Sequence, residues 1–245
     1  MAGTILNMIT VAIGTTLGLF IGHRLSQKIQ ESVVTGLGLV TLYVGIDSAG
    51  QTGNVIIPLI SVVIGAIIGE LLDIEHWLEQ VADWLRSRFA GGTGEDDSAA
   101  RTRFVNGFIT ASLVFCIGPL TFLGSIQDGM GLPQGFQQLA IKSVLDMFAG
   151  MAFAASFGIG VSFSIVTILV LQGGLALAGS LFGQFMSVPM VDEMTAVGGL
   201  LLVGLGLVLL DVKRPRIANF LPALVIAPLM VAVAEALGIN IYPFG

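Results

Sequence analysis

The feature that most constrains this chain is a stretch from Met147 to Val191 that contains no charged residue. A membrane-spanning helix needs about 20 apolar residues. The stretch is therefore too long for one span and predicts two, with a turn near Gly158–Gly160. Charged residues make up 11% of the chain and hydrophobic residues 55%, whereas soluble domains carry roughly 25% charged residues. Because so few charges cannot cover a surface in water, we expect an all-α, polytopic membrane protein.

Apolar segments predict about eight transmembrane helices, which a chain of 245 residues can accommodate with short loops. The expected helices are Gly3–Gly22, a segment between Glu31 and Asp47, Asn54–Leu72, Phe104–Gln127, Gln137–Phe157, Val161–Phe185, a segment between Glu193 and Asp211, and Ile217–Leu237. We expect the second and seventh to be short. The first lacks the basic flank of a signal peptide and is long enough to span, so we interpret it as a retained helix.

Lysine and arginine residues predict the orientation. Of the ten, Lys142 lies within a predicted helix, and the others fall on one side of the eight-helix arrangement. They follow the first, third and seventh helices: Arg24, Lys28, Arg86, Arg88, Arg101, Arg103, Lys213, Arg214 and Arg216. Because cytoplasmic loops are enriched in Lys and Arg, we expect an inner-membrane protein with both termini outside. A seven-helix arrangement would scatter these charges over both sides.

The main polar excursion follows the third helix, at residues 73–103. Within it, Leu72–Phe89 places apolar residues, including Trp77 and Trp84, at helical spacing, which predicts an amphipathic helix. Such a helix suits the membrane interface, and packing on the protein's own surface is the alternative. Gly91–Ala100 is rich in Gly, Ser and acidic residues, which predicts a mobile linker.

Several residues recur after 161 positions, which indicates an internal repeat. Gly18, Gly22, Gly38 and Gly45 correspond to Gly179, Gly183, Gly199 and Gly206, Ser26 corresponds to Ser187, Glu31 corresponds to Asp192, and Pro58 corresponds to Pro222 after a slip of three residues. We expect one three-helix repeat at residues 1–72, a central helix pair at 104–158 and a second repeat at 159–245. The repeats would enter the membrane from opposite sides, so they would be inverted, as in many transporters and some channels.

The glycines and the short helices have two interpretations. Short, glycine-interrupted helices at matching positions of two repeats point to a binding site, which favours the second and seventh helices. Gly14, Gly18 and Gly22, with Gly179 and Gly183, also form stripes of small residues that suit close helix packing. For these five glycines we prefer packing, either within the chain or in a homo-oligomer.

The central helix pair carries the residues that are unusual for a membrane. Pro119 removes a backbone hydrogen bond near Cys116 and leaves a carbonyl close to Phe115 without its usual donor. This predicts either a simple kink or a break that faces a polar route. Lys142 and Asp146 are four residues apart and so lie on one helix face.

Intramembrane charges are functional candidates by default. The alternative is that Lys142 lies at the outer interface and snorkels, with Asp146 as its counter-ion. Ser125, Gln127 and Asp128 form a polar patch that could be an outer mouth. Gln172 in the sixth helix and Asn7 in the first are further polar candidates, and an interhelical hydrogen bond is the alternative for each.

The sequence offers no support for enzymatic chemistry. No Ser/His/Asp set, no phosphate-binding loop and no metal-binding spacing is present, and Cys116 is the only cysteine. We therefore expect no catalytic residue, no metal, no cofactor and no nucleic-acid partner.

Several motifs together resemble the YdfK/YqgA-like family of bacterial membrane proteins. They are Gly3–Asn7, Phe115–Pro119, Gly124–Gly129, Lys142–Asp146, Gly158–Val161 and Gln172–Gly173. The resemblance covers nearly the whole chain. It implies an inner-membrane protein of transport type without indicating a substrate, and it draws attention to Lys142, Asp146, Asp128 and Gln172.

From these observations we expect passage of a small ion or polar solute across the lipid bilayer. The predicted site lies between the central helix pair and the short second and seventh helices. The alternative is a membrane scaffold or sensor subunit that does not transport and that binds a cytoplasmic partner through the amphipathic helix and linker.

Overall fold

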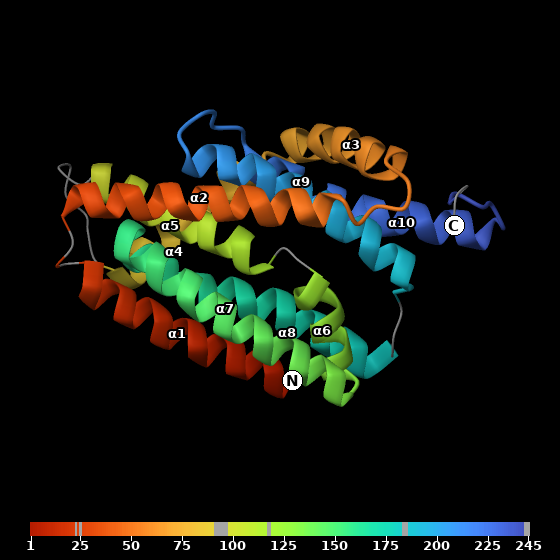
Figure 1. Cartoon of the computed structure of the whole chain (residues 1–245), viewed down its shortest axis with the longest axis horizontal. Coiled ribbons are helices and arrows are strands. Elements are labelled where there is room, and N and C mark those ends of the chain that lie inside the picture. The colour runs from red at the N-terminus through yellow and green to blue at the C-terminus, as the bar shows by residue number, and fades with distance from the viewer. Residues whose placement is uncertain (23, 25, 91–97, 117–118, 183–185, 243–245) are drawn as a thin grey trace. The chain divides into compact units, whose positions relative to one another are not determined.

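A computed structural model describes residues 1–22, 24, 26–90, 98–116, 119–182 and 186–242, which form helices and no strands (Figure 1). The elements are α1 (Ala2–Gly22), α2 (Gln27–Ala49), α3 (Ile56–Leu72), α4 (Ile74–Leu85), the π-helical turn η1 (Arg86–Ala90), α5 (Ser98–Cys116), α6 (Pro119–Gly129), α7 (Pro133–Phe157), the 3-10 turn η2 (Ile159–Phe163), α8 (Ser164–Phe182), α9 (Val188–Leu209), the 3-10 turn η3 (Ile217–Phe220) and α10 (Ala223–Ala236). The predicted all-α class is confirmed.

Within the described residues, 6 stretches are long and apolar enough to cross a membrane unaided: those of α1, α2, α7, α8, α9 and α10. Two further pairs of consecutive helices pass the same test together, α3 with α4 and α5 with α6, which gives up to 8 spans. The chain is therefore an all-α polytopic membrane protein, as the apolar segments predict.

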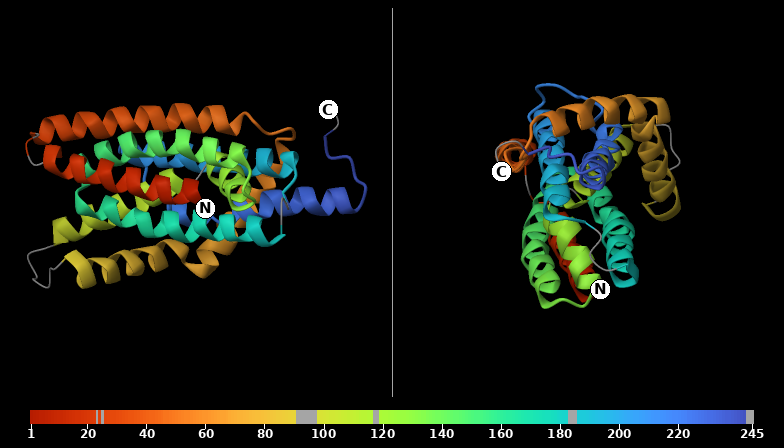
Figure 2. Two further views of the ribbon diagram at one scale, coloured as in Figure 1. Left: turned by 90° about the horizontal axis from the view of Figure 1, so that it is seen from below. Right: turned by 90° about the vertical axis from the view of Figure 1, so that its right-hand side faces the viewer.

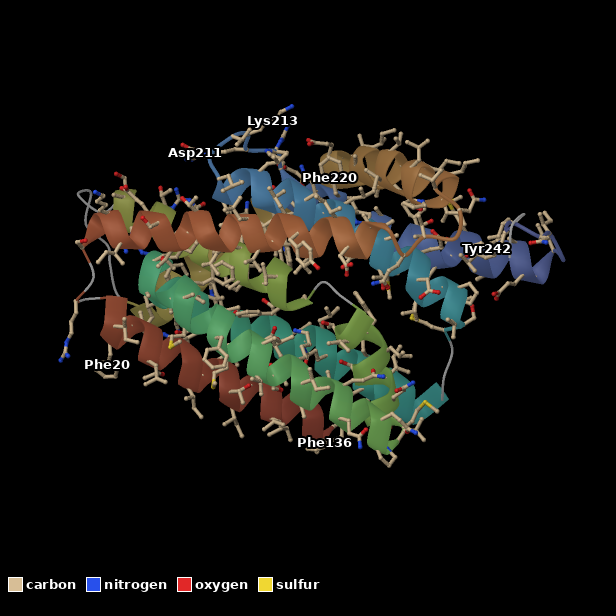
Figure 3. All side chains as sticks on the ribbon, viewed as in Figure 1. Phe20, Phe136, Asp211, Lys213, Phe220 and Tyr242 are labelled. Atoms are coloured by element: carbon tan, nitrogen blue, oxygen red, sulfur yellow. The ribbon has the colours of Figure 1, made fainter. Side chains whose placement is uncertain are left out.

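The outer surface of α1 shows why lipid must cover it. Ile5, Ile9, Ile13 and Leu17 recur every fourth residue and are exposed, and Phe20 points away from the helix (Figure 3). The opposite face of α1 is made of small and polar residues and is buried. A helix that turns branched apolar side chains outward and polar ones inward is stable only in an apolar solvent.

The helices form two compact units. The first unit contains α1, the start of α2, and α4 to α8, while the second contains α2 from Gly38 onward, α3, α9, η3 and α10. Each unit therefore combines helices from both predicted repeats, so the boundaries predicted at residues 72 and 159 do not separate the compact units. In the first unit, α1 and α7 lie side by side in both views (Figures 1 and 2).

The second and seventh predicted helices are not short. α2 has 23 residues and α9 has 22. The prediction ended both helices at charged residues, but Glu31 lies inside α2 and Glu193 inside α9. An interruption is present elsewhere: the predicted helix 104–127 consists of α5 and α6, whose axes differ by 65°.

Two other boundaries differ from the prediction. α7 begins at Pro133, a residue suited to the first helical position, and not at Gln137. Of the predicted linker, residues 91–97 lie outside the described residues, and 98–100 already belong to α5.

The predicted amphipathic helix corresponds to α4. Its apolar residues do not share one environment: Ala82 and Leu85 are buried in a cluster with Phe104, Val105 and Phe108, whereas Trp77 and Trp84 are exposed. Arg101 of α5 donates from Nε to Asp83 at 2.7 Å and so ties α5 to α4.

Helix boundaries recur at the spacing of the predicted repeat. A shift of 161 residues carries α2 onto 188–210, against Val188–Leu209 for α9, and carries α1 onto 163–183, against Ser164–Phe182 for α8. The corresponding serines, Ser26 and Ser187, each stand directly before the helix. Ser187 caps α9 by accepting from the Met190 amide at 3.4 Å.

Candidate functional site

The charged pair of α7 lies deep in the first unit. Lys142 and Asp146 are 5% and 6% exposed. Because α7 starts at Pro133, Lys142 lies more than two turns inside the helix, about 14 Å from its start, and Asp146 lies next to the helix midpoint. The Lys142 ammonium donates to the Asp146 carboxylate, with both side chains buried, so it does not snorkel to a surface of the unit.

A third side chain completes this group. Asn7 of α1 is fully buried, and its Nδ2 donates to Oδ2 of Asp146 at 2.9 Å, the oxygen that also accepts from Lys142. Asn7 Oδ1 has no hydrogen-bond partner. The result is a buried network with one formal positive charge, one negative charge and one amide whose acceptor is unused.

A glycine stripe brings Asn7 to Asp146. Gly14 and Gly18 pack against the main-chain carbonyls of Met147 and Met151, and a Cβ on Gly22 would lie 2.5 Å from the Ala155 carbonyl oxygen. Only helices without side chains at these positions can approach so closely. The contacts advance in the same direction along both helices, so α1 and α7 run parallel.

The packing interpretation also holds for the predicted counterpart of this stripe. Gly179 of α8 packs against the main-chain carbonyl of Ile126 in α6. Gly183 lies outside the described residues.

The end of α5 lies near this network. α5 ends at Cys116, which is buried and close enough to Lys142 and Asp146 to interact with their charges. α6 begins at Pro119, and residues 117–118 lie outside the described residues. The Phe115 carbonyl, which the sequence predicts to lack a donor, accepts from the Thr121 hydroxyl at 3.3 Å.

The predicted outer patch lies at the end of α6 and against the start of α1. Asp128 is buried, and its Oδ2 accepts from the Gly3 amide at 3.1 Å. The amino group of Met1 lies 3.1 Å from the same oxygen. Ser125 is buried one turn earlier on α6, and Gln127 is half-buried.

The first unit contains several buried polar atoms that have no hydrogen-bond partner. Among the described residues they are Thr4 Oγ1, Asn7 Oδ1, Ser125 Oγ, Gln127 Oε1, Gln138 Oε1 and both amide atoms of Gln172. Leaving such an atom unpaired costs about 1–3 kcal/mol. Buried polar groups of this kind are usually satisfied by water or a ligand.

Some of these atoms were not predicted from the sequence. Thr4 and Gln138 look like ordinary membrane-helix residues there. The signal on α1 was the spacing of Thr4, Asn7, Val11 and Thr15 on its buried face.

Comparison with known proteins places the chain in a family. The model of the family described as "Protein of unknown function (DUF554)" matches residues 2–232. The chain belongs to this family.

Two curated relatives are similar over almost their full lengths. The "Uncharacterized protein YqgA" of Escherichia coli (strain K12) is 31% identical over 226 residues, which are 92% of this chain and 94% of that protein. The "Uncharacterized membrane protein YdfK" of Bacillus subtilis (strain 168) is 24% identical over 244 residues, 98% and 100% of the two chains. No solved structure matches. The resemblance to a YdfK/YqgA-like family is thus confirmed.

This DUF554 protein also has a buried carboxylate in its second unit, at a residue that the sequence places at the boundary of the predicted seventh helix. Glu193 of α9, in the second unit, is fully buried. It accepts from the Thr52 hydroxyl at 2.7 Å and from the amides of Gly53 and Asn54 at 3.0 and 3.3 Å. The carboxylate therefore satisfies donors that precede α3.

The segment after α10 packs on the same loop. Asn54 donates to the Ile241 carbonyl at 2.6 Å. The Tyr242 ring packs against Gly53, where an added Cβ would be only 2.7 Å from the ring. Burial and the neighbouring negative charge of Glu193 raise the pKa of Tyr242. These contacts join residues far apart in the chain, so the sequence carries no direct signal for them.

Proposed function

We propose that this protein passes a small ion or polar solute across the bacterial inner membrane, and that it does so without catalysing a reaction. The observation that carries the proposal is the buried network of Lys142, Asp146 and Asn7 near the middle of a membrane helix. Each charge costs at least about 2.5 kcal/mol at the centre of a spanning helix. Residues of this kind in membranes commonly mark ion or solute pathways.

The pathway we propose follows the polar side chains of the first unit. Asp128, Ser125 and Gln127 form its entrance at the end of α6, and the Lys142–Asp146 pair forms its centre. Unpaired oxygens at Thr4, Asn7 and Ser125 and the unpaired amide of Gln172 would interact with the solute or its water. Cys116 borders the pathway at the end of α5, and Pro119 begins α6 after the interruption.

The pair can act as a switch because its charges cancel. A solute that competes for the Lys142 ammonium would release the Asp146 carboxylate, and Asn7 would then remain its donor. The exchange leaves no buried charge alone, because Lys142 then interacts with the solute and Asp146 keeps the hydrogen bond from Asn7. We infer that the ion pair holds the resting state and that the solute replaces one of its members.

The crossing of α2 and α9 in the second unit supports the proposed inverted repeats. A Cβ on Gly206 would lie 3.2 Å from the Gly38 carbonyl oxygen, and a Cβ on Gly45 would lie 2.9 Å from that of Gly199, so α2 and α9 cross antiparallel. The earlier glycine of α2, Gly38, meets the later glycine of α9, Gly206, and the later one, Gly45, meets the earlier one, Gly199. Two helices related by a two-fold axis in the membrane plane, as in inverted repeats, cross in this way. Such repeats are common in transporters with alternating access.

The parallel course of α1 and α7 agrees with the proposed eight-span topology, in which these are the first and fifth spans and enter from the same side. The nine basic residues on one predicted side then favour both termini outside.

The test is a flux measurement on the purified protein in liposomes. Osmotic swelling is followed in potassium, sodium, chloride and phosphate salts and in small neutral solutes. We expect at least one solute to enter faster than in protein-free liposomes. The Lys142→Met/Asp146→Asn variant should slow that entry roughly tenfold or more, which corresponds to losing about 1.4 kcal/mol of interaction.

The matched control removes an exposed ion pair, Arg214 with Asp211 at 2.9 Å, through Arg214→Met/Asp211→Asn. This variant should transport like the wild type. Equal flux in the wild type and in the Lys142/Asp146 variant would refute the site. A folded wild-type protein that admits none of the solutes would refute transport.

A further inference from the structure

The apolar face of α4 is partly covered by the protein and partly exposed, and the proposed function does not explain the exposed part. Viewed down the helix, Ile74, Trp77, Leu78, Val81, Ala82, Trp84 and Leu85 form one continuous apolar arc, and Glu75, His76, Glu79, Gln80, Asp83 and Ser87 lie on the other side. An apolar arc of this width is normally covered throughout. In α4 the protein covers only part of it.

The covered part of the arc is the contact with α5. Ala82 and Leu85 are 0% and 4% exposed and pack with Phe104, Val105 and Phe108. The Asp83–Arg101 interaction fixes the rotation of α4 about its axis in this contact. The face that α4 turns away from α5 is therefore determined by the fold.

The other part of the arc presents both tryptophans of the chain. Trp77 and Trp84 are 60% and 61% exposed, and they lie two turns apart on one stripe, with Arg88 one turn further and also exposed. Tryptophan is enriched at the boundary between lipid headgroups and acyl chains, where its ring is apolar and its N–H is hydrated. Basic residues beside it favour the headgroup phosphates.

We propose that α4 lies in the plane of the membrane interface, with Trp77 and Trp84 inserted between the lipid headgroups and the acyl chains. The continuity of the chain supports lipid as the occupant. α4 follows directly on α3, whose last residues, Leu71 and Leu72, are apolar and highly exposed, as lipid-facing residues are. Only Asp73, in the left-handed conformation with φ of 49°, separates the two helices.

Because the chain has 2 tryptophans and both lie on α4, the intrinsic fluorescence of the full-length protein reports on this helix alone. The protein is reconstituted in phosphatidylcholine–phosphatidylglycerol vesicles. The lipids carry bromine either near the headgroup end or near the methyl end of the acyl chain. Insertion of about 5–10 Å predicts that shallow bromine quenches the emission roughly twofold more strongly than deep bromine.

Single-tryptophan variants test the orientation of the helix. Trp77→Phe and Trp84→Phe each leave one ring, and the two rings are about 10 Å apart along the helix axis. A helix in the interface plane gives the same ratio of shallow to deep quenching for both variants. If α4 instead continued α3 through the bilayer, one ring would be quenched mainly by deep bromine, and that result would overturn the proposal.

Two further outcomes would also overturn it. Strong quenching by aqueous iodide without quenching by bromine would place the tryptophans in water. Protection from both quenchers would mean that protein, such as a second copy of this chain, covers the stripe. Since the native protein gives the primary result, the test does not depend on whether a variant folds.

Discussion

Gly45 and Gly199 face each other in the second unit, where each leaves room for the other's main chain. A Cβ on Gly45 would lie 2.9 Å from the Gly199 carbonyl oxygen, and a Cβ on Gly199 would lie 2.6 Å from that of Gly45. Both are members of the predicted 161-residue repeat. Their counterparts, Gly206 and Gly38, meet in the same crossing of α2 and α9.

The first prediction follows from this contact. Gly45→Ala and Gly199→Ala should each destabilise the protein by about 1–3 kcal/mol, because the new methyl group meets backbone that cannot move without separating the helices. Gly36→Ala is the control, since a Cβ there has no neighbour within 4 Å. It should be neutral or stabilising by up to about 1 kcal/mol. Unfolding in detergent, followed by circular dichroism, measures all three, and equal stabilities would contradict the contact.

The second prediction separates the structural from the functional part of the Lys142–Asp146 pair. Lys142→Met alone leaves a buried, uncompensated carboxylate and should cost about 3–5 kcal/mol. The double variant Lys142→Met/Asp146→Asn should recover most of this stability, because no buried charge remains. Flux should stay low in both. A double variant that is stable and transports fully would leave the pair without a function.

The third prediction concerns the buried carboxylate of the second unit. Glu193→Gln removes the charge that accepts from Thr52, Gly53 and Asn54, so we expect a loss of about 1.5–3 kcal/mol in unfolding free energy. The control is Glu235→Gln, whose carboxylate is exposed and accepts from Ser187 at 3.0 Å. Its effect should stay within about 0.5 kcal/mol. Thermal unfolding measures both, and similar losses would show that burial of Glu193 contributes nothing.

The fourth prediction is a loss of stability at high pH. The folded-state pKa of Tyr242 lies above the unfolded value, so the folded protein favours the neutral phenol. This interaction is fully present below about pH 10, the unfolded pKa of tyrosine, and stability falls as pH rises further. Tyr242→Phe should remove that part of the decline. Tyr43→Phe, which changes the chain's other tyrosine, is the control because Tyr43 is 72% exposed.

Much of the fold could be predicted because lipid imposes a simple rule on helices that cross it. Long apolar runs without charge identify spans, and Lys142 and Asp146 are conspicuous because they interrupt one. The ends of α2 and α9 could not be predicted from the charges. Glu193 extends α9 beyond the predicted end because Thr52 and Asn54, far away in the chain, satisfy its carboxylate.

The candidate site was only partly predictable because it depends on contacts between residues far apart in the chain. From the sequence, Asn7 is a polar candidate in the first helix without an identified partner, and packing brings it to Asp146, 139 positions later. The glycine stripe that makes this approach possible is visible in the sequence, but its partner helix is not. Likewise, the apolar arc of α4 indicated amphipathicity, whereas its division between α5 and an exposed stripe depends on tertiary packing.

The central claim is that water and solute reach the Lys142–Asp146 pair. A native cysteine near the pair can report whether the aqueous phase reaches it. Cys116 is the only cysteine, is buried, and lies close to both charges. The decisive measurement is the modification of Cys116 by a hydrophilic, membrane-impermeant thiosulfonate on the folded protein in liposomes, compared with the protein unfolded in detergent. We predict that the thiol of the folded protein is modified from the aqueous phase. A thiol that reacts only after unfolding would contradict the account.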